Sequence, residues 1–296
     1  MPPEGLANVM ISEGILNQGG CSDRVELRGR VVRIGGFDPA YTLGGDRGVF
    51  KWGDVGEVGD GKVVLVVGGY SIVDFRECGN GESLTKYLAE WLIREAKRVG
   101  VRVNDIAIDA TSVQEVFCDF VDELSGGKVY RVKFGGNASE RRIYGMSGDR
   151  YFSNRVSEIY GVMLEYILNG QVKGLSEEVM KELTRRQLKG TSNGKVMLES
   201  KVDYKKREGC SPDLADALGL MCIYMREGLG IDFGGGWGDR GVGSIMYLRE
   251  GIGIGIDEGD GYGESDAEAE AIRRSAAWRL DMEGGDNGEV NTWDYI

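Results

Sequence analysis

Residues 211–218 read Ser-Pro-Asp-Leu-Ala-Asp-Ala-Leu, and they carry more information about the fold than any other stretch of the chain. Ser and Pro are common at the start of a helix, and the spacing of Asp213 and Asp216 places both carboxylates on one helical face. A capped helix explains this pattern by itself. Asp38 and Asp109 suggest that the same residues also belong to a site, because each of these two aspartates ends a strand-like apolar run.

The segments around these acids follow strand and helix patterns in turn. Strand patterns cover residues 31–37, 49–52, 62–70, 106–109, 129–134 and 195–200. Helix patterns cover residues 82–99, 112–124, 150–169, 176–188 and 211–225. Because the first three strands form an antiparallel meander and later strands alternate with helices, we predict an α/β fold with a central mixed sheet of five strands.

Composition divides the chain into three parts. Residues 1–30 are a weakly patterned lead-in, residues 31–229 form the predicted domain, and residues 230–296 form a Gly-rich acidic tail that we expect to be flexible. The tail holds 15 acidic and 5 basic residues, whereas residues 1–229 hold 33 acidic and 31 basic residues. The net charge of −12 therefore comes mostly from the tail, and the domain itself can present a basic face.

The residue types that are missing exclude several kinds of chemistry. The chain contains no histidine, so an imidazole base, a Ser-His or Cys-His nucleophile and a His-ligated metal are all excluded. Its five cysteines show no CxxC spacing, which argues against a zinc site or a disulfide framework. No apolar run is long enough to span a membrane and the N-terminus has no signal-peptide pattern, so we expect no membrane partner and no secretion.

Acids from three distant parts of the chain are expected to meet. Asp38 and Asp109 follow strands, and ligands of α/β sheets bind at the carboxyl ends of strands. Clustered carboxylates repel one another unless a cation compensates their charge. Oxygen ligands without His or Cys suit Mg²⁺ or Mn²⁺, and two such ions would activate a water and stabilise the leaving oxygen of a phosphodiester.

Short motifs in a fixed order narrow this interpretation. They are GFDPA at 36–40, GGDR at 44–47, IDAT at 108–111, Asn154-Arg155 with Glu158, Glu199-Ser200-Lys201, Lys205-Lys206-Arg207, Gly209 and the 211–218 stretch. Over roughly residues 30–225 the chain resembles the RNase H-like nuclease superfamily, and within it the nuclease domain of the large terminase subunit of tailed bacteriophages. The resemblance implies an RNase H-like fold and an endonuclease that cuts concatemeric viral DNA during genome packaging.

The resemblance also implies roles for residues and partners. Asp38 and Asp109 become catalytic metal ligands, with Asp213 or Asp216 as the third acid; we favour Asp213 as the catalytic aspartate and keep Asp216 as a partner that also binds metal. Two Mg²⁺ or Mn²⁺ ions are the implied cofactors. The implied partners are double-stranded DNA and a packaging motor with an ATPase domain or subunit, a small terminase and a portal, in the cytoplasm of the host cell.

One departure from the family pattern is large. Terminases carry an ATPase domain before the nuclease, but no GxxxxGK[ST] phosphate loop occurs in this sequence. ATP hydrolysis is therefore not assigned to this chain, and residues 1–30 are interpreted as a linker remnant. Two alternatives stay open: another RNase H-like nuclease, such as a junction resolvase or RNase H, and a non-catalytic docking module of a packaging motor.

Basic residues near the acid pair are candidates for contact with the DNA backbone. They are Lys195, Lys201, Lys205, Lys206 and Arg207, with Arg141 and Arg142 as a second group. Phosphate contacts require Lys and Arg near the scissile group, although a solvated hairpin gives the same charge run. Arg155 and Glu158 have the i,i+3 spacing of an ordinary helix ion pair, so we assign them a structural role.

Overall fold

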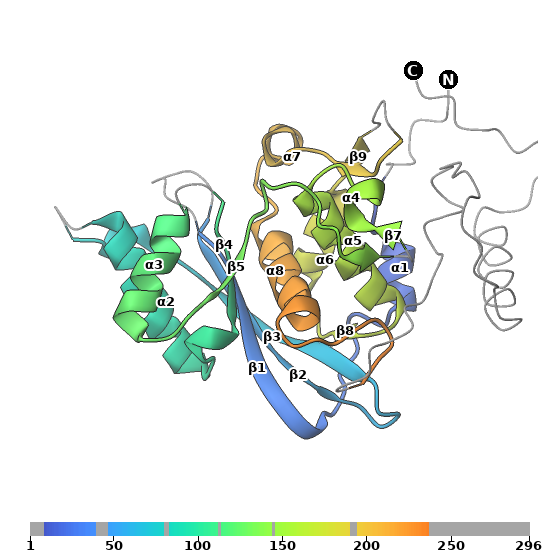
Figure 1. Cartoon of the computed structure of the whole chain (residues 1–296), viewed down its shortest axis with the longest axis horizontal. Coiled ribbons are helices and arrows are strands. Elements are labelled where there is room, and N and C mark those ends of the chain that lie inside the picture. Colours follow the sequence, from blue (N-terminus) through green and yellow to red (C-terminus); the bar gives the residue numbers. More distant parts are fainter. Residues whose placement is uncertain are drawn as a thin grey trace, which may run out of the picture.

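A six-stranded mixed sheet separates two layers of helices in the computed structural model (Figure 1). The structure describes residues 9–39, 47–79, 83–111, 114–143, 146–189 and 194–236. Its strands are β1 (Arg28–Asp38), β2 (Val49–Glu57), β3 (Val63–Ile72), β4 (Ile106–Asp109), β5 (Tyr130–Val132), β6 (Arg142–Ile143), β7 (Met146–Ser147), β8 (Val172–Lys173), β9 (Leu188–Lys189) and β10 (Met197–Leu198). Its α-helices are α1 (Glu13–Gln18), α2 (Leu84–Val99), α3 (Gln114–Ser125), α4 (Gly148–Tyr151), α5 (Arg155–Leu168), α6 (Glu177–Arg185), α7 (Lys201–Glu208) and α8 (Asp213–Glu227).

The strands of the sheet lie in the order β5-β4-β1-β2-β3-β8. β1, β2 and β3 form the predicted antiparallel meander, and β4 and β5 continue from β1 in parallel. The α/β prediction is confirmed, but the count of five strands is wrong. The sixth strand, β8, has two residues that pair in parallel with Leu65 and Val66 of β3, and a strand this short has no recognisable alternation.

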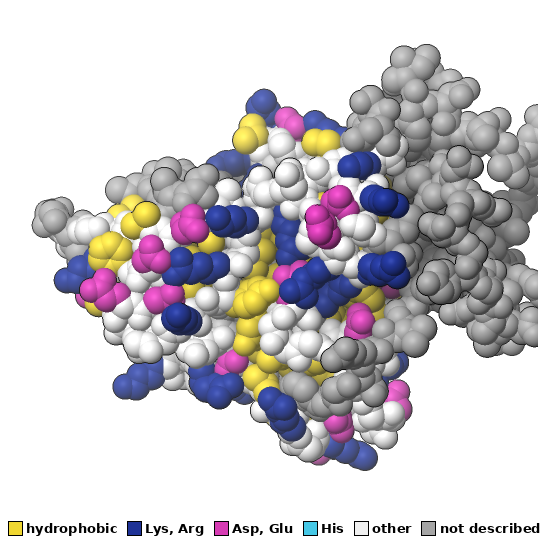
Figure 2. All heavy atoms as spheres, in the orientation of Figure 1, with side chains coloured by type: hydrophobic (Ala, Val, Ile, Leu, Met, Phe, Trp, Pro, Cys, Tyr) yellow, Lys and Arg dark blue, Asp and Glu magenta, His cyan; other side chains and the backbone are white. Residues whose placement is uncertain are grey.

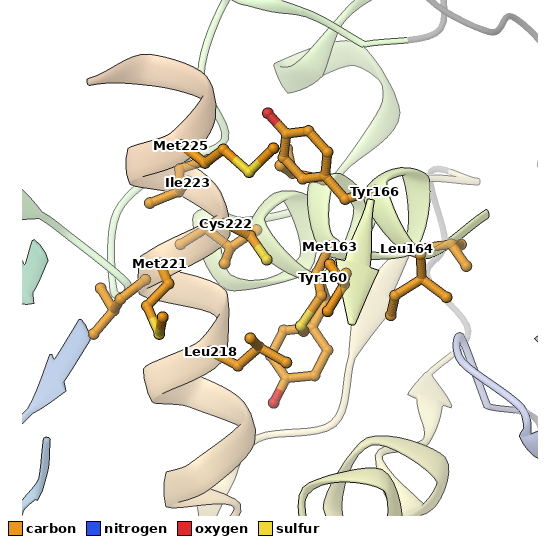
Figure 3. Close-up of a cluster of buried hydrophobic side chains, with 14 of the residues drawn as sticks. Tyr160, Met163, Leu164, Tyr166, Leu218, Met221, Cys222, Ile223 and Met225 are labelled. Carbon is orange, nitrogen blue, oxygen red and sulfur yellow. The ribbon is translucent and has the colours of Figure 1, made fainter. Parts of the chain in front are cut away.

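Each face of the sheet is covered by its own helices. α2 and α3 cover one face, where Phe37 of β1 joins their apolar core. α5, α6 and α8 cover the other face, beneath which Ile34 is fully buried. Because side chains alternate along a strand, one strand serves both cores. Figure 3 shows Tyr160 and Met163 of α5 packed against Leu218 of α8 in the second core.

Two elements differ from the sequence prediction between residues 150 and 210. The single helix predicted for residues 150–169 is interrupted, since Phe152 is extended and bridges Val196, and α5 begins anew after Asn154. Asn154 caps α5 by accepting a hydrogen bond from Ser157 N at 3.0 Å. The charge run at 201–207 forms α7, not a hairpin, and Ser200 caps it.

The predicted lead-in is partly core. Residues 9–21 contain α1, which packs against α5, and four of their side chains are buried in the core below it. These buried residues are Met10, Ile11, Leu16 and Cys21. Residues 1–8 lie outside the described part of the chain, so a linker interpretation is confined to them.

The folded domain also extends past residue 229. Ile231 and Phe233 are buried, and Val63 N donates a hydrogen bond to the carbonyl oxygen of Gly235 at 3.1 Å. The remaining predicted tail, residues 237–296, lies outside the described residues. Within the described ranges, no helix is both long and apolar enough to cross a membrane.

Candidate metal centre

Asp38 and Asp109 are neighbours at the carboxyl ends of two strands. β1 and β4 are parallel and pair Phe37 with Ile108, so the residues that follow lie side by side. Alternation turns both aspartates to the face covered by α8. Both carboxylates are nearly buried, with exposed fractions of 6% for Asp38 and 9% for Asp109. The predicted pairing of these acids at one edge of the sheet is what the structure shows.

The start of α8 adds Asp213 and Asp216 to the same place. Its N-cap residue, Pro212, makes no side-chain cap, and Glu182 of α6 takes over this function by accepting a hydrogen bond from Ala215 N at 2.9 Å. Asp213 and Asp216 are each 1% exposed. The helix N-terminus therefore delivers two buried carboxylates to the strand ends.

Lys201, the first residue of α7, places its ammonium group among three of these acids. Its Nζ lies 2.6 Å from Asp38 Oδ2, 3.1 Å from Asp213 Oδ1 and 3.2 Å from Asp216 Oδ2. Asp38 thus shares one cation with two acids that lie 175 and 178 positions later in the sequence. The prediction assigned Lys201 to the DNA backbone, whereas the contacts that it makes here are with the acid cluster.

The charges of this cluster shift the pKa values of its members. Burial raises the pKa of Asp38 to about 7, with help from the Asp216 and Asp213 charges and against the pull of Lys201. Burial alone would lower the pKa of the Lys201 ammonium, but the surrounding carboxylates outweigh it and hold that pKa well above its ordinary value. Lys201 is therefore a stable cation, and the pKa of Asp38 is raised into the neutral range although this cation lies against it.

Asp109 is oriented by three hydrogen bonds to a single oxygen. Its Oδ1 accepts from Thr111 Oγ1 at 2.6 Å, from Thr111 N at 3.1 Å and from Phe134 N at 3.2 Å. Burial raises the pKa of Asp109 in spite of these bonds, and the charge of nearby Asp216 adds to the effect. Because Oδ1 is held in this way, the carboxylate is fixed in rotation.

Asp213 and Asp216 have different surroundings. Asp213 Oδ2 accepts from the backbone nitrogen of Arg47 at 3.2 Å, while its Oδ1 is buried and has no hydrogen-bond partner. Asp216 Oδ1 accepts from Tyr160 Oη at 2.9 Å and from Arg186 Nη1 at 3.4 Å. Each acid thus directs its other oxygen to Lys201, at 3.1 Å for Asp213 Oδ1 and 3.2 Å for Asp216 Oδ2.

This donor set fits a hard divalent cation. All four side chains offer carboxylate oxygens, and Asp213 Oδ1 is a buried acceptor that lies 3.1 Å from the Lys201 ammonium, where a metal cation would satisfy it equally. The ammonium of Lys201 already acts as a stand-in for positive charge at this point. In the described part of the chain no three His, Cys, Asp or Glu residues form a ready metal cluster. The acids are spaced around an ammonium instead.

The stability of the metal-free protein should depend on pH. The folded pKa of Asp38 is about 7, far above its ordinary value, so the folded state binds a proton that the unfolded state has lost. The free energy of unfolding should therefore fall as the pH rises from about 4 to about 7, by at most about 4 kcal/mol from this residue. Urea unfolding at pH 5 and pH 7.5 measures the fall, and Asp38→Asn should reduce it. If the free energy of unfolding fell equally between these two pH values in the parent and in Asp38→Asn, the raised pKa of Asp38 would be contradicted.

The predicted basic residues are spread over two places, and several of them already have partners. Arg207 contacts the carboxylates of Glu199 and Glu208, and Lys195 Nζ donates to the Asp149 carbonyl at 2.6 Å. Lys205 and Lys206 are exposed on α7. On the face drawn in Figure 2, dark blue and magenta side chains alternate among the described residues.

The second basic group lies near α8. Arg141 is exposed and its Nε lies 3.6 Å from Glu227, while Arg142 is exposed on β6. Arg155 is the better-buried partner of Glu227, at 2.8 Å, and it also pairs with Glu158 at 2.7 Å. The structural role predicted for Arg155 and Glu158 agrees with these contacts.

Three residues at the site were missed by the sequence analysis. Glu182 caps α8, and Tyr160 and Arg186 bind Asp216. Each of them lies at least 30 positions from the residue that it contacts, so no local pattern could show the contact. A buried Arg at the end of an amphipathic helix is the kind of residue that only a tertiary structure can assign.

The fold that carries this acid cluster was compared with known protein families, sequences and structures. Neither a protein-family profile nor a curated protein sequence matches the chain. The solved nuclease domain of the large terminase subunit gp2 of bacterial virus Sf6 does match, with a TM-score of 0.51 and 21% identity over 73% of this chain and 98% of that one. This chain has the fold of a large-terminase nuclease domain. The RNase H-like fold that the motifs predicted is thereby confirmed.

Variants of the same Sf6 domain match equally well. The form with manganese and beta-thujaplicinol and the form with calcium each give a TM-score of 0.52, with the same 21% identity and the same coverage. Those domains bind divalent cations. At this level of identity the likeness establishes the fold, and function has to be argued from the site.

Proposed function

We propose that this chain is a divalent-metal-dependent DNA endonuclease that cuts concatemeric viral DNA during genome packaging. The observation that carries the proposal is the convergence of Asp38, Asp213 and Asp216 on the Lys201 ammonium at the strand ends, beside Asp109. A polypeptide buries this many acids at one point only if cations compensate them. The terminase nuclease fold supports the choice of DNA as substrate.

The four aspartates would hold two Mg²⁺ or Mn²⁺ ions. Bound there, such ions supply Lewis acidity and an activated water for phosphodiester hydrolysis. The chain provides orientation: Thr111 and Phe134 fix Asp109, and the Arg47 backbone fixes Asp213. With no histidine in the sequence, carboxylates are left to carry the ligand role.

Lys201 has two positions in this proposal. Its side chain is one-third exposed, so its ammonium can leave the acids when divalent cations replace it. It then lies close enough to the site to contact a DNA phosphate, which preserves the contact predicted from the sequence. Lys195, Lys205, Lys206, Arg207, Arg141 and Arg142 are proposed to contact the DNA backbone further away.

The biological setting is also part of the proposal. An ATPase domain or subunit, a small terminase and a portal are the proposed partners, in the host cytoplasm. ATP hydrolysis is assigned to another domain or chain because this sequence contains no phosphate loop. The likeness to the Sf6 domain supports this setting.

Nicking of supercoiled plasmid tests the activity directly. We expect relaxed and linear DNA to form with Mn²⁺ or Mg²⁺ and no cleavage after EDTA treatment. Linear duplex, a four-way junction and an RNA–DNA hybrid, compared at equal concentration, separate the proposed activity from a resolvase or RNase H. Preference for the junction or the hybrid would replace the terminase assignment, and no cleavage of any substrate would favour a docking module.

Replacing Lys201 with Met should have opposite effects on the metal-free and metal-bound protein. Without the ammonium, three buried carboxylates lose their compensating charge, so the free energy of unfolding without metal should fall by about 3 kcal/mol, the low end for a broken buried ion pair, since Lys201 is one-third exposed. Mn²⁺ should bind more tightly, since no ammonium competes for the same oxygens. Thermal unfolding with and without Mn²⁺ measures both effects.

Lys206→Met is the matched control, because Lys206 lies on the same helix and is exposed. This variant should unfold like the parent in both conditions. If Mn²⁺ stabilised Lys201→Met no more than it stabilised the parent, the ammonium and the metal would not share a position.

A further inference from the structure

Asp216 is held on the side away from Lys201 by two side chains that the proposed chemistry does not use. Tyr160 Oη donates to Asp216 Oδ1 at 2.9 Å, and Arg186 Nη1 contacts the same oxygen at 3.4 Å. Tyr160 is fully buried on α5, and Arg186 follows α6 with an exposed fraction of 2%. Two helices therefore converge on one oxygen of one acid.

Arg186 is itself locked in place. Its guanidinium lies over the rings of Tyr160 and Tyr204, 5.3 Å and 5.9 Å from their centroids. Its Nε donates to the carbonyl oxygen of Glu199 at 3.2 Å. Stacking on both rings and a backbone contact leave the guanidinium little freedom, so its position is set before any ligand arrives.

The two acids of α8 are held by different groups. Asp213 Oδ2 accepts from the backbone nitrogen of Arg47 at 3.2 Å, whereas Asp216 Oδ1 contacts the side chains of Tyr160 and Arg186. Of the two oxygens of Asp216, Oδ2 is the one that faces the cation position, 3.2 Å from Lys201 Nζ. A carboxylate whose second oxygen is held by two donors is prepared to bind an ion through one oxygen.

We infer that Tyr160 and Arg186 are positioning residues that fix Asp216 as a one-oxygen metal ligand through Oδ2. The inference rests on the proposed metal-dependent function and adds to it the groups that set ligand geometry. Groups that hold a ligand's other oxygen typically change metal affinity about 10- to 100-fold when they are removed. A buried ion pair that served stability alone would gain little over apolar side chains of the same size, which makes a role in positioning the better account.

Tyr160→Phe tests the inference by removing one hydroxyl. The Mn²⁺ concentration that gives half-maximal nicking should rise about tenfold or more, with a smaller change in the rate at saturating Mn²⁺. The increase in thermal midpoint produced by a fixed, sub-saturating Mn²⁺ concentration should shrink as well. This second measurement requires no catalysis.

Tyr166→Phe is a close control. Tyr166 lies on the same helix and is equally buried, but its hydroxyl donates to the Ile231 carbonyl at 2.5 Å, away from the acids. Figure 3 shows the two hydroxyls pointing to opposite ends of the α5–α8 core. Both variants lose one buried hydrogen bond, so both should lose stability, but only Tyr160→Phe should change the response to Mn²⁺.

Arg186→Lys extends the test to the second donor. Lysine keeps the positive charge and lacks the planar fork that reaches both Asp216 and the Glu199 carbonyl, so a weaker response to Mn²⁺ is again expected. Unchanged Mn²⁺ dependence in Tyr160→Phe and Arg186→Lys would overturn the inference while leaving the proposed function intact. If the parent gained no stability from Mn²⁺ and cut no DNA, the proposed function and this inference would both be overturned.

Discussion

Replacing Asp109 with Asn should abolish plasmid nicking and leave the fold intact. The substitution keeps the size of the side chain, and the Asn oxygen can still accept from Thr111 and the Phe134 backbone. It removes a negative charge at the point where the proposed cations bind. Loss of a group that stabilises transition-state charge costs about 10²- to 10³-fold in rate, and we expect at least this loss here.

Stability should change in the opposite direction to activity. Burial raises the pKa of Asp109, which means that its charged form is costly in the folded metal-free protein. A neutral Asn avoids this cost, so the thermal midpoint without metal should stay level or rise. The gain in midpoint on adding Mn²⁺ should shrink, since one ligand is missing.

Asp105→Asn is the matched control for this experiment. Asp105 is a buried acid immediately before β4, at the end opposite Asp109, and it accepts from Tyr224 Oη at 2.9 Å and pairs with Arg102 at 2.6 Å. Its loss should lower stability and leave nicking and Mn²⁺ response unchanged. Activity of Asp109→Asn equal to that of the parent would show that the acid cluster is not the catalytic site.

The parts of the site that could be predicted from the sequence are those that follow from short local sequence patterns. Asp38 and Asp109 each end an apolar run, and the carboxyl ends of parallel strands meet at one edge of a sheet. Asp213 and Asp216 share a helical face through their spacing alone. Their convergence therefore followed from secondary structure and topology, before any side-chain contact was known.

The remaining contacts depend on how helices pack, which the sequence does not show. Lys201 stands in a run of basic residues and looks like any solvated lysine, yet α7 turns its ammonium into the acid cluster. Glu182 looks like an ordinary acid of an amphipathic helix and instead caps α8. The predicted domain boundaries, at residues 31 and 229, were wrong for a similar reason. α1 and residues 230–236 belong to the folded domain because they contact elements that are distant in the sequence.

Close contact between α8 and β1 sets the site, and Gly36→Ala tests it. An ideal Cβ at Gly36 would lie 2.2 Å from the Ala217 carbonyl oxygen and 3.0 Å from Met221 Cγ, both on α8. Relief requires the helix to move away from the sheet, so we expect a loss of about 2–3 kcal/mol in the free energy of unfolding. The start of α8 would move with it and shift Asp213 and Asp216, and a displacement of this kind can cost about 100-fold in rate.

Gly59→Ala, whose nearest neighbour would be Arg28 Nη1 at 3.9 Å, should change neither urea unfolding nor nicking. Parent-like behaviour of Gly36→Ala would mean that helix packing does not position these carboxylates.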